Sequence, residues 1–126
     1  ELRALIPENA DVVFHGGVSD EQYAALLADD AILVSASHDE GYGLPLAEAL
    51  EFGVPAVVSN LPIFHEVAGD GALYFKVGDA KSFATAVQRL DTLASRKKLV
   101  SLGKKHIAMY SWEKSARTLL SAIKRL

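Results

Sequence analysis

Three short runs of consecutive apolar residues limit the fold of this chain more than any other feature of its sequence. The runs are Val12-Val13-Phe14, Ile32-Leu33-Val34 and Ala56-Val57-Val58, and each is followed by small or polar residues and then by a helical pattern. Because the runs are apolar throughout and do not alternate with polar residues, they predict parallel strands covered on both faces. A fourth, weaker run lies at Ala72-Leu73-Tyr74-Phe75.

Helical patterns fill the segments between these runs. They predict helices over residues 20–28, 45–52 and 63–67. Ser19 can cap the first of these helices, and Gly53 fits just past the end of the second. Strands that alternate with helices through short links predict an α/β fold with an open, doubly wound parallel sheet.

After Gly78 the pattern becomes wholly helical. Asp79 can cap one helix, Ser95 opens another that runs towards Tyr110, and Ser111 opens the last. The last helix carries one apolar stripe, formed by Trp112, Ala116, Leu119, Leu120 and Ile123. Three or four strands make a thin sheet for a doubly wound fold, so we expect upstream βα units to be missing. The prediction is therefore one partial domain over residues 1–126, truncated at its N-terminus.

The composition of the chain argues against several classes of binding partner and site. The chain has 126 residues, a hydrophobic fraction of 50% and a net charge of −3, which predict a real core and argue against nucleic acid and anionic membranes as main partners. It contains no cysteine, which excludes disulfides, cysteine-based zinc sites and thiol nucleophiles in this chain. No run approaches 18 apolar residues. We expect a soluble, cytoplasmic protein, with any membrane association made through absent parts.

The turn that follows the second apolar run carries the chemistry. In an open parallel sheet, ligands bind outside the carboxyl ends of the strands. Here a strand leads through Gly41, Tyr42, Gly43 and Leu44 into a helix whose first position suits Pro45. Gly43 and Leu44 offer no side chain that could cap the helix, so its first N–H groups need an acceptor. A phosphate group would meet both this need and the positive end of the helix dipole.

Two carboxylates frame this turn. Glu40 lies in the loop, and Glu48 lies about one turn into the helix. A carboxylate can accept hydrogen bonds from two neighbouring hydroxyls, as on a ribose or a hexose. A purely structural interpretation is also open, in which Glu40 solvates the loop and Glu48 favours the helix N-terminus electrostatically. The pattern alone does not decide between the two.

The segment resembles the signature of the GT4-type family of retaining glycosyltransferases. The signature, E-G-F-G-L-P-x-x-E-A-M-A-x-G-x-P-V-V-x-S, corresponds here to the run from Glu40 to Leu50 and then to Gly53-Val54-Pro55-Ala56-Val57-Val58-Ser59. Flanking segments also resemble the family: Phe14-His15-Gly16-Gly17-Val18-Ser19-Asp20, Glu66-Val67-Ala68-Gly69-Asp70-Gly71-Ala72, and Ser111-Trp112. The resemblance covers nearly the whole chain in order.

The resemblance implies the C-terminal half of a GT-B fold, in which two Rossmann-like domains face each other across a cleft. Glu40 would then be the catalytic residue beside the donor sugar, and Glu48 would bind the ribose hydroxyls of a nucleotide sugar. Main-chain N–H groups of residues 41–44 would contact the sugar and the diphosphate. Gly17 and Val18 would hold the base. Tyr42 stands where the family usually has Phe.

The resemblance further implies transfer of a hexosyl group with retention, without a bound metal or a cofactor. The other partners would be an unknown acceptor and an N-terminal domain of the same protein, which the helix over residues 111–126 would face. The family's basic pair, which neutralises the leaving diphosphate, lies upstream of this sequence. We therefore expect the isolated chain to be inactive.

The other polar residues are interpreted as structural. His38 and His65 lack metal-ligand spacing, and His15 and Glu66 are interpreted as parts of the scaffold. Ser35, Ser37 and Ser59 lack the G-x-S-x-G pattern of a hydrolase. Two alternatives to a transferase remain: a non-catalytic module that binds a nucleotide or phosphate, and a nucleotide-sugar epimerase of similar architecture.

Overall fold

The computed structural model describes residues 2–28 and 30–125. Its centre is a parallel sheet of three strands in the order β1-β2-β3: β1 (Leu33–Ser35), β2 (Ala56–Ser59) and β3 (Leu73–Phe75). Leu33 of β1 lies opposite Ala56, and Val57 of β2 lies opposite Leu73. The α/β class and the parallel sheet predicted from the apolar runs are confirmed.

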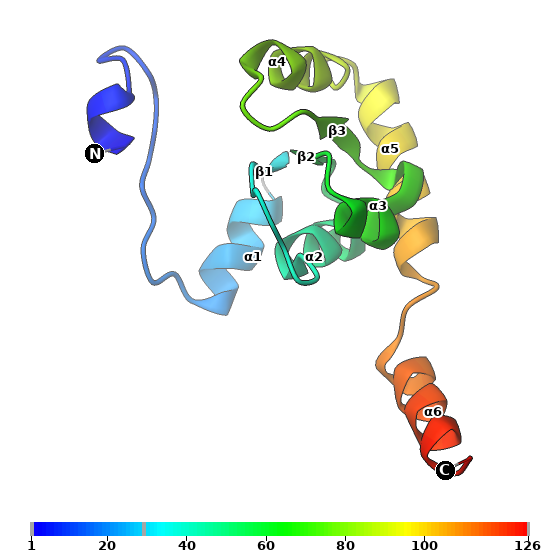
Figure 1. The fold of residues 1–126 in the computed structure, drawn as a ribbon. Helices are drawn as coiled ribbons and strands as arrows, with labels where there is room; N and C mark the ends of the chain where they lie inside the picture. Colours follow the sequence, from blue (N-terminus) through cyan, green and yellow to red (C-terminus); the bar gives the residue numbers. More distant parts are fainter. Residues whose placement is uncertain (1, 29, 126) are drawn as a thin grey trace.

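Helices surround this sheet and extend beyond it (Figure 1). In chain order the helical elements are η1 (Leu2–Leu5), α1 (Asp20–Ala28), α2 (Leu44–Phe52), α3 (Pro62–Ala68), η2 (Gly69–Gly71), α4 (Ala80–Gln88), α5 (Leu93–Ile107) and α6 (Trp112–Ile123). The bounds of α1, α2 and α3 lie within one residue of the predicted ranges, whereas the short helix η2 was not predicted.

The middle strand β2 explains why the sheet is covered on both faces. All four of its residues are buried, and successive side chains point to opposite faces. Ala56 and Val58 pack against α2 and α3, where Phe64 is fully buried. Val57 packs on the other face, in a cluster with residues of α4 and α5 that includes Leu90. Two apolar clusters of the core thus share one strand, and a third cluster lies between α1 and α2.

Helix α5 approaches the sheet through glycine. A Cβ added to Gly71 in η2 would overlap the Cα of Gly103 in α5, so the two backbones lie in direct contact. A Cβ added to Gly103 would lie 2.6 Å from Cδ2 of Leu50 in α2. These two small residues allow α5 to pack closely on the α3–β3 connection.

Several predicted caps are confirmed. The Ser19 hydroxyl accepts a hydrogen bond from the N–H of Gln22 at 3.3 Å, while the Gln22 side chain accepts one from the Ser19 N–H at 2.9 Å. Asp79 accepts from the N–H of Ser82, and Ser111 accepts from the N–H of Lys114. Gly53 ends α2 with a φ of 81°, in the left-handed region that glycine adopts at low cost.

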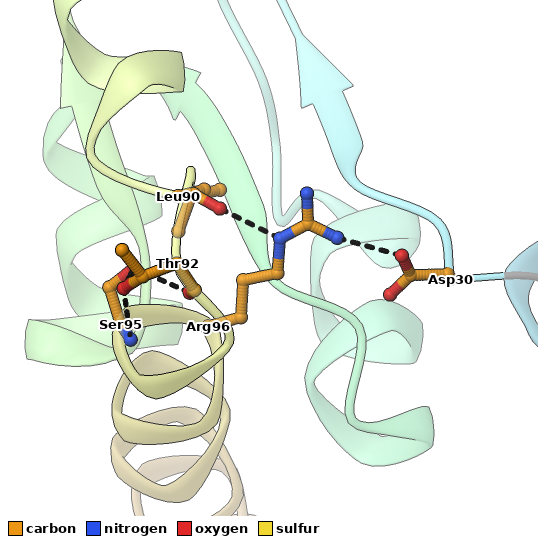
Figure 2. A network of polar contacts seen from close by, with 5 residues as sticks. All are labelled: Asp30, Leu90, Thr92, Ser95 and Arg96. Carbon is orange, nitrogen blue, oxygen red and sulfur yellow. Dashed lines mark hydrogen bonds and ion pairs between the residues drawn. The ribbon is translucent and has the colours of Figure 1, made fainter.

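The predicted start of α5 is wrong by three residues. Thr92, and not Ser95, is the N-cap, because the Thr92 hydroxyl accepts a hydrogen bond from the Ser95 N–H at 3.1 Å. Figure 2 shows this cap beside the Arg96 guanidinium. Its Nε donates to the carbonyl of Leu90 at 2.7 Å, and its Nη1 pairs with Asp30 at 2.9 Å. Arg96 thereby ties the start of α5 to the loop that precedes β1.

The strand predicted at Val12-Val13-Phe14 is also wrong. These residues form neither helix nor strand, and all three are exposed, Val13 by 69%. A strand exists only through hydrogen bonds to a neighbouring strand, and no segment of residues 2–28 pairs with the sheet. Phe14 contacts the guanidinium of Arg3, whose Cζ lies 4.5 Å from the ring centroid. In Figure 1 this part of the chain runs apart from the sheet.

Helix α6 extends away from the rest of the chain at the other end (Figure 1). None of its described residues is buried, and Trp112 is 91% exposed. The predicted apolar stripe therefore has no partner among the residues that the structure describes. No helix within the described ranges is both long and apolar enough to cross a membrane.

Candidate functional site

The carboxyl ends of β1 and β2 meet at one edge of the sheet. β1 ends at Ser35 and β2 ends at Ser59. The Ser59 side chain is fully buried, and its hydroxyl donates a hydrogen bond to the Ser35 carbonyl at 3.3 Å. The loop that leaves β1 here leads to α2, so this edge holds the turn that the sequence singled out.

Glu40 lies in this loop and is half-buried. The Ser37 hydroxyl donates to its Oε1 at 2.9 Å, and the Ser37 and Ser35 hydroxyls lie 3.2 Å apart. The Glu40 N–H donates to the Asp39 carboxylate at 3.0 Å. A line of hydroxyl groups thus connects the Glu40 carboxylate to the ends of the two strands.

The start of α2 is open, as the sequence predicts. Gly43 precedes the helix with φ 85° and ψ 56°, and no side chain caps the helix. Its carbonyl accepts hydrogen bonds from the N–H groups of Leu46 and Ala47 at 2.9 and 3.2 Å. Within the described ranges, the N–H groups of residues 41–44 have no acceptor. They form a group of four adjacent donors at the positive end of a helix, a suitable site for an anion or for hydroxyl oxygens.

Side chains leave this helix start accessible. Tyr42 is 39% exposed and Leu44 is 62% exposed, whereas Gly43 is buried. A Cβ on Gly43 would lie 2.6 Å from Cε1 of Phe64, the fully buried aromatic residue of α3. Phe64 thus lies directly beneath the turn and fixes the position of its backbone.

Glu48 lies one turn into α2 and is half-buried. Its neighbour across the helix pair is Tyr23 of α1. Burial raises the pKa of the Tyr23 phenol, and the Glu48 carboxylate raises it further through its charge and through a hydrogen bond. Tyr23 therefore keeps its proton beside the Glu48 carboxylate. The sequence analysis did not single out Tyr23, because only the packing of α1 on α2 brings it to Glu48.

Gly17 and Val18 lie in the turn before α1. Gly17 has a φ of 65°, and no atom of the described residues lies within 4 Å of the position of a Cβ at Gly17. Val18 is exposed. Within the described ranges, no backbone hydrogen bond joins this pair to the turn over residues 41–44.

The other sequence candidates occupy the scaffold. His65 stacks on Tyr74 with ring centroids 3.7 Å apart and contacts the Asn60 side chain at 2.6 Å. The carbonyl of Glu66 accepts hydrogen bonds from His106 and from Tyr110, so Glu66 holds α3 against α5 through its backbone. Within residues 2–28 and 30–125, no group of three acidic or histidine side chains could hold a metal ion.

Three pockets of the structure lie away from the two glutamates. One of about 530 Å³ lies between β3 and α5 and includes Tyr74 and Lys98 in its lining. A second of about 340 Å³ shares Tyr74 and lies along α4, and a third of about 480 Å³ lies beside Arg96. The start of α2 is a better candidate site than these three pockets, because it combines adjacent N–H donors with two carboxylates.

The fold matches that of GT-B glycosyltransferases. The solved structure of sucrose-phosphate synthase from Thermosynechococcus elongatus superposes with a TM-score of 0.76 and 26% sequence identity, over 90% of this chain and 29% of that chain. Residues 4–109 match the family model described as "Glycosyl transferases group 1". The chain belongs to the group 1 glycosyltransferase family, which confirms the glycosyltransferase class and the GT-B fold predicted from the sequence. The GT4 type and the retention of configuration stay predictions.

Mannosyltransferases are among the proteins that this chain is similar to. One is the O-antigen chain mannosyltransferase RfbU of Salmonella typhimurium, 34% identical over 81% of this chain and 28% of its own length. Another is the MMP alpha-(1->4)-mannosyltransferase of Mycolicibacterium hassiacum, 35% identical over 79% of this chain and 26% of its own length. The chain thus spans under a third of these relatives.

Proposed function

We propose that this chain supplies the donor-binding part of a GT4-type glycosyltransferase that transfers a hexosyl group from a nucleotide diphosphate sugar with retention of anomeric configuration. The observation that carries the proposal is the open start of α2, with four free N–H groups between two half-buried glutamates. The mannosyltransferase names of the two relatives favour mannose as the hexose.

The four N–H groups bind the diphosphate and nearby sugar hydroxyls. Negative charge develops on the diphosphate as the bond to the sugar breaks, and backbone donors already aimed at that position stabilise the charge without reorganisation. The positive end of the α2 dipole adds to this effect. The remaining charge stabilisation comes from basic residues outside this chain, in the complete protein. No metal ion takes part in this proposal.

Glu40 and Glu48 have different roles in this proposal. Glu40 accepts hydrogen bonds from the donor sugar and lies beside the carbon that becomes positively charged as the leaving group departs. Glu48 accepts from the ribose hydroxyls, a contact made equally in the ground and transition states. Gly17 and Val18 hold the base through their backbone. An N-terminal domain, against which α6 packs, binds the acceptor.

Steady-state kinetics of the complete protein test these roles, with a panel of UDP- and GDP-hexoses that includes mannose. Glu40→Gln should lower kcat, because the lost charge interacts with the transition state more strongly than with the substrate. Glu48→Gln should raise the donor KM by roughly tenfold to a hundredfold, as expected for the loss of a hydrogen bond to a charged group, about 1.5–3 kcal/mol. NMR of the product gives its anomeric configuration.

Glu51→Gln is the matched control, because Glu51 lies on the same helix and is exposed. It should leave both kinetic constants unchanged. If Glu40→Gln and Glu48→Gln melt early but keep normal kcat and KM, the two residues belong to the scaffold and the site assignment is wrong. If the wild-type protein transfers no sugar from any donor of the panel, the proposed function itself is wrong.

A further inference from the structure

The Glu40 carboxylate is held by one side chain. Its loop belongs to no helix or strand, so the backbone alone does not fix the direction of the carboxylate. Within the described ranges, the Ser37 hydroxyl is the only side-chain donor to it, at 2.9 Å from Oε1. Oε2 has no partner among these residues, which leaves one oxygen held and one oxygen available.

The Ser37 hydroxyl is itself held by a residue at the end of a strand. The Ser35 hydroxyl lies 3.2 Å from it, at the end of β1. The Ser35 carbonyl accepts from the hydroxyl of Ser59, which is fully buried at the end of β2. The carboxylate is therefore connected, through three serines, to the carboxyl ends of β1 and β2.

Proton counting fixes the direction of the central contact. A hydroxyl has one proton to donate, and an ionised carboxylate can only accept. Ser37 gives its proton to Glu40, so in the contact between Ser35 and Ser37 the Ser35 hydroxyl must be the donor. Both hydroxyls therefore point their protons towards Glu40, and each polarises the next. Such aligned hydrogen bonds strengthen one another in a partly buried site.

We propose that Ser37 is a positioning residue, which holds Oε1 of Glu40 so that Oε2 faces the donor sugar. This inference rests on the proposed function, since it deepens the role assigned to Glu40. Ser37 touches no substrate and acts only through the carboxylate. A small error in the position of a reacting group costs rate and leaves binding intact, because the donor is held mainly by other groups.

Kinetics of the complete protein test the role. Ser37→Ala should lower kcat about tenfold, the usual effect of losing a hydrogen bond to a charged group, and should change the donor KM by less than about twofold. Ser37→Thr keeps a hydroxyl and should restore most of the rate. Ser101→Ala, at an exposed serine of α5, is the matched control and should change neither constant.

A double-mutant cycle separates positioning from a general structural effect. On a Glu40→Ala background, Ser37→Ala should add no further loss of kcat, because its only route to the reaction is gone. If Ser37→Ala does not fold, Ser35→Ala takes its place, with a smaller loss of kcat expected. Losses that multiply in the cycle, or an unchanged kcat for Ser37→Ala in an active protein, would overturn the positioning role. A wild-type protein without transferase activity would instead overturn the proposed function.

Discussion

Gly43 combines two structural requirements in one residue, and replacing it by alanine tests both. Its φ of 85° lies in the left-handed region, where a side chain clashes with its own backbone. A Cβ at this position would also lie 2.6 Å from Cε1 of Phe64, closer than any ordinary carbon contact. Phe64 is 1% exposed and packed within the core, so its ring has no free space to move into.

The expected destabilisation of Gly43→Ala is the sum of these two effects. A left-handed conformation costs a non-glycine residue roughly 1–2 kcal/mol. Forcing an extra methyl group into a well-packed core costs roughly 1–3 kcal/mol more. The total of about 2–5 kcal/mol is a large part of the 5–15 kcal/mol that typically stabilises a protein. Relief of the clash requires the turn to rise away from Phe64, which would also displace the N–H groups of residues 41–44.

Gly41→Ala is the matched control, two residues earlier in the same turn. Gly41 does not have a positive φ, and no atom of the described residues lies within 4 Å of the position of a Cβ at Gly41. Hydrogen–deuterium exchange of the complete protein should show faster exchange over α2 in Gly43→Ala and wild-type exchange in Gly41→Ala. Urea denaturation gives the free energy of unfolding of each variant. If Gly43→Ala matches the wild type within about 0.5 kcal/mol, the tight packing of this turn on Phe64 is wrong.

Two further predictions concern the scaffold. Burial, with a contribution from the Asp70 carboxylate, raises the pKa of Tyr74 to about 12, so the folded protein keeps a proton that the unfolded chain loses near pH 10. The free energy of unfolding that this proton contributes below pH 10 is therefore lost between pH 10 and about 12. Urea denaturation over this pH range should show a smaller loss of stability in Tyr74→Phe than in the wild type. This variant also lacks the hydrogen bond to the Gly69 carbonyl. Gly71→Ala should lower the melting temperature more than Gly103→Ala. The reason is that the new Cβ at position 71 meets backbone atoms, whereas the one at position 103 meets the end of a leucine side chain. Equal melting temperatures would contradict the backbone contact.

Local sequence rules predicted the parts of the fold that local interactions determine. The caps at Ser19, Asp79 and Ser111 follow from side chains that reach an N–H two or three residues away. The burial of β2 follows from its uninterrupted apolar run. The error at the start of α5 has the same origin, because Thr92 and Ser95 are both good capping residues and the pattern alone does not order them.

Interactions between distant residues could not be predicted in the same way. The apolar run at Val12-Val13-Phe14 resembles a buried strand, but strand formation requires a neighbour that the described residues do not provide. The contact of Tyr23 with Glu48 depends on how α1 packs against α2. The link from Ser59 to Ser35 depends on the register of two strands that are 24 residues apart in the sequence.

A comparison of α2 with α3 shows why the start of α2 is the better candidate for a binding site. A Leu-Pro pair stands at the start of each helix, as the first two residues of α2 and as the N-cap and first residue of α3, and neither helix has a side-chain cap. Their local sequence signals are therefore alike. Before α3, however, the N–H of Asn60 bonds to the Phe75 carbonyl and that of Leu61 to the Ser59 carbonyl, both at 2.8 Å. Before α2, the corresponding N–H groups have no acceptor within the described residues. The backbone differs at the same point, because Gly43 before α2 adopts the left-handed region whereas Leu61 before α3 is extended, with φ −106° and ψ 142°. The N–H groups before α2 are therefore the ones that a bound ligand can pair with.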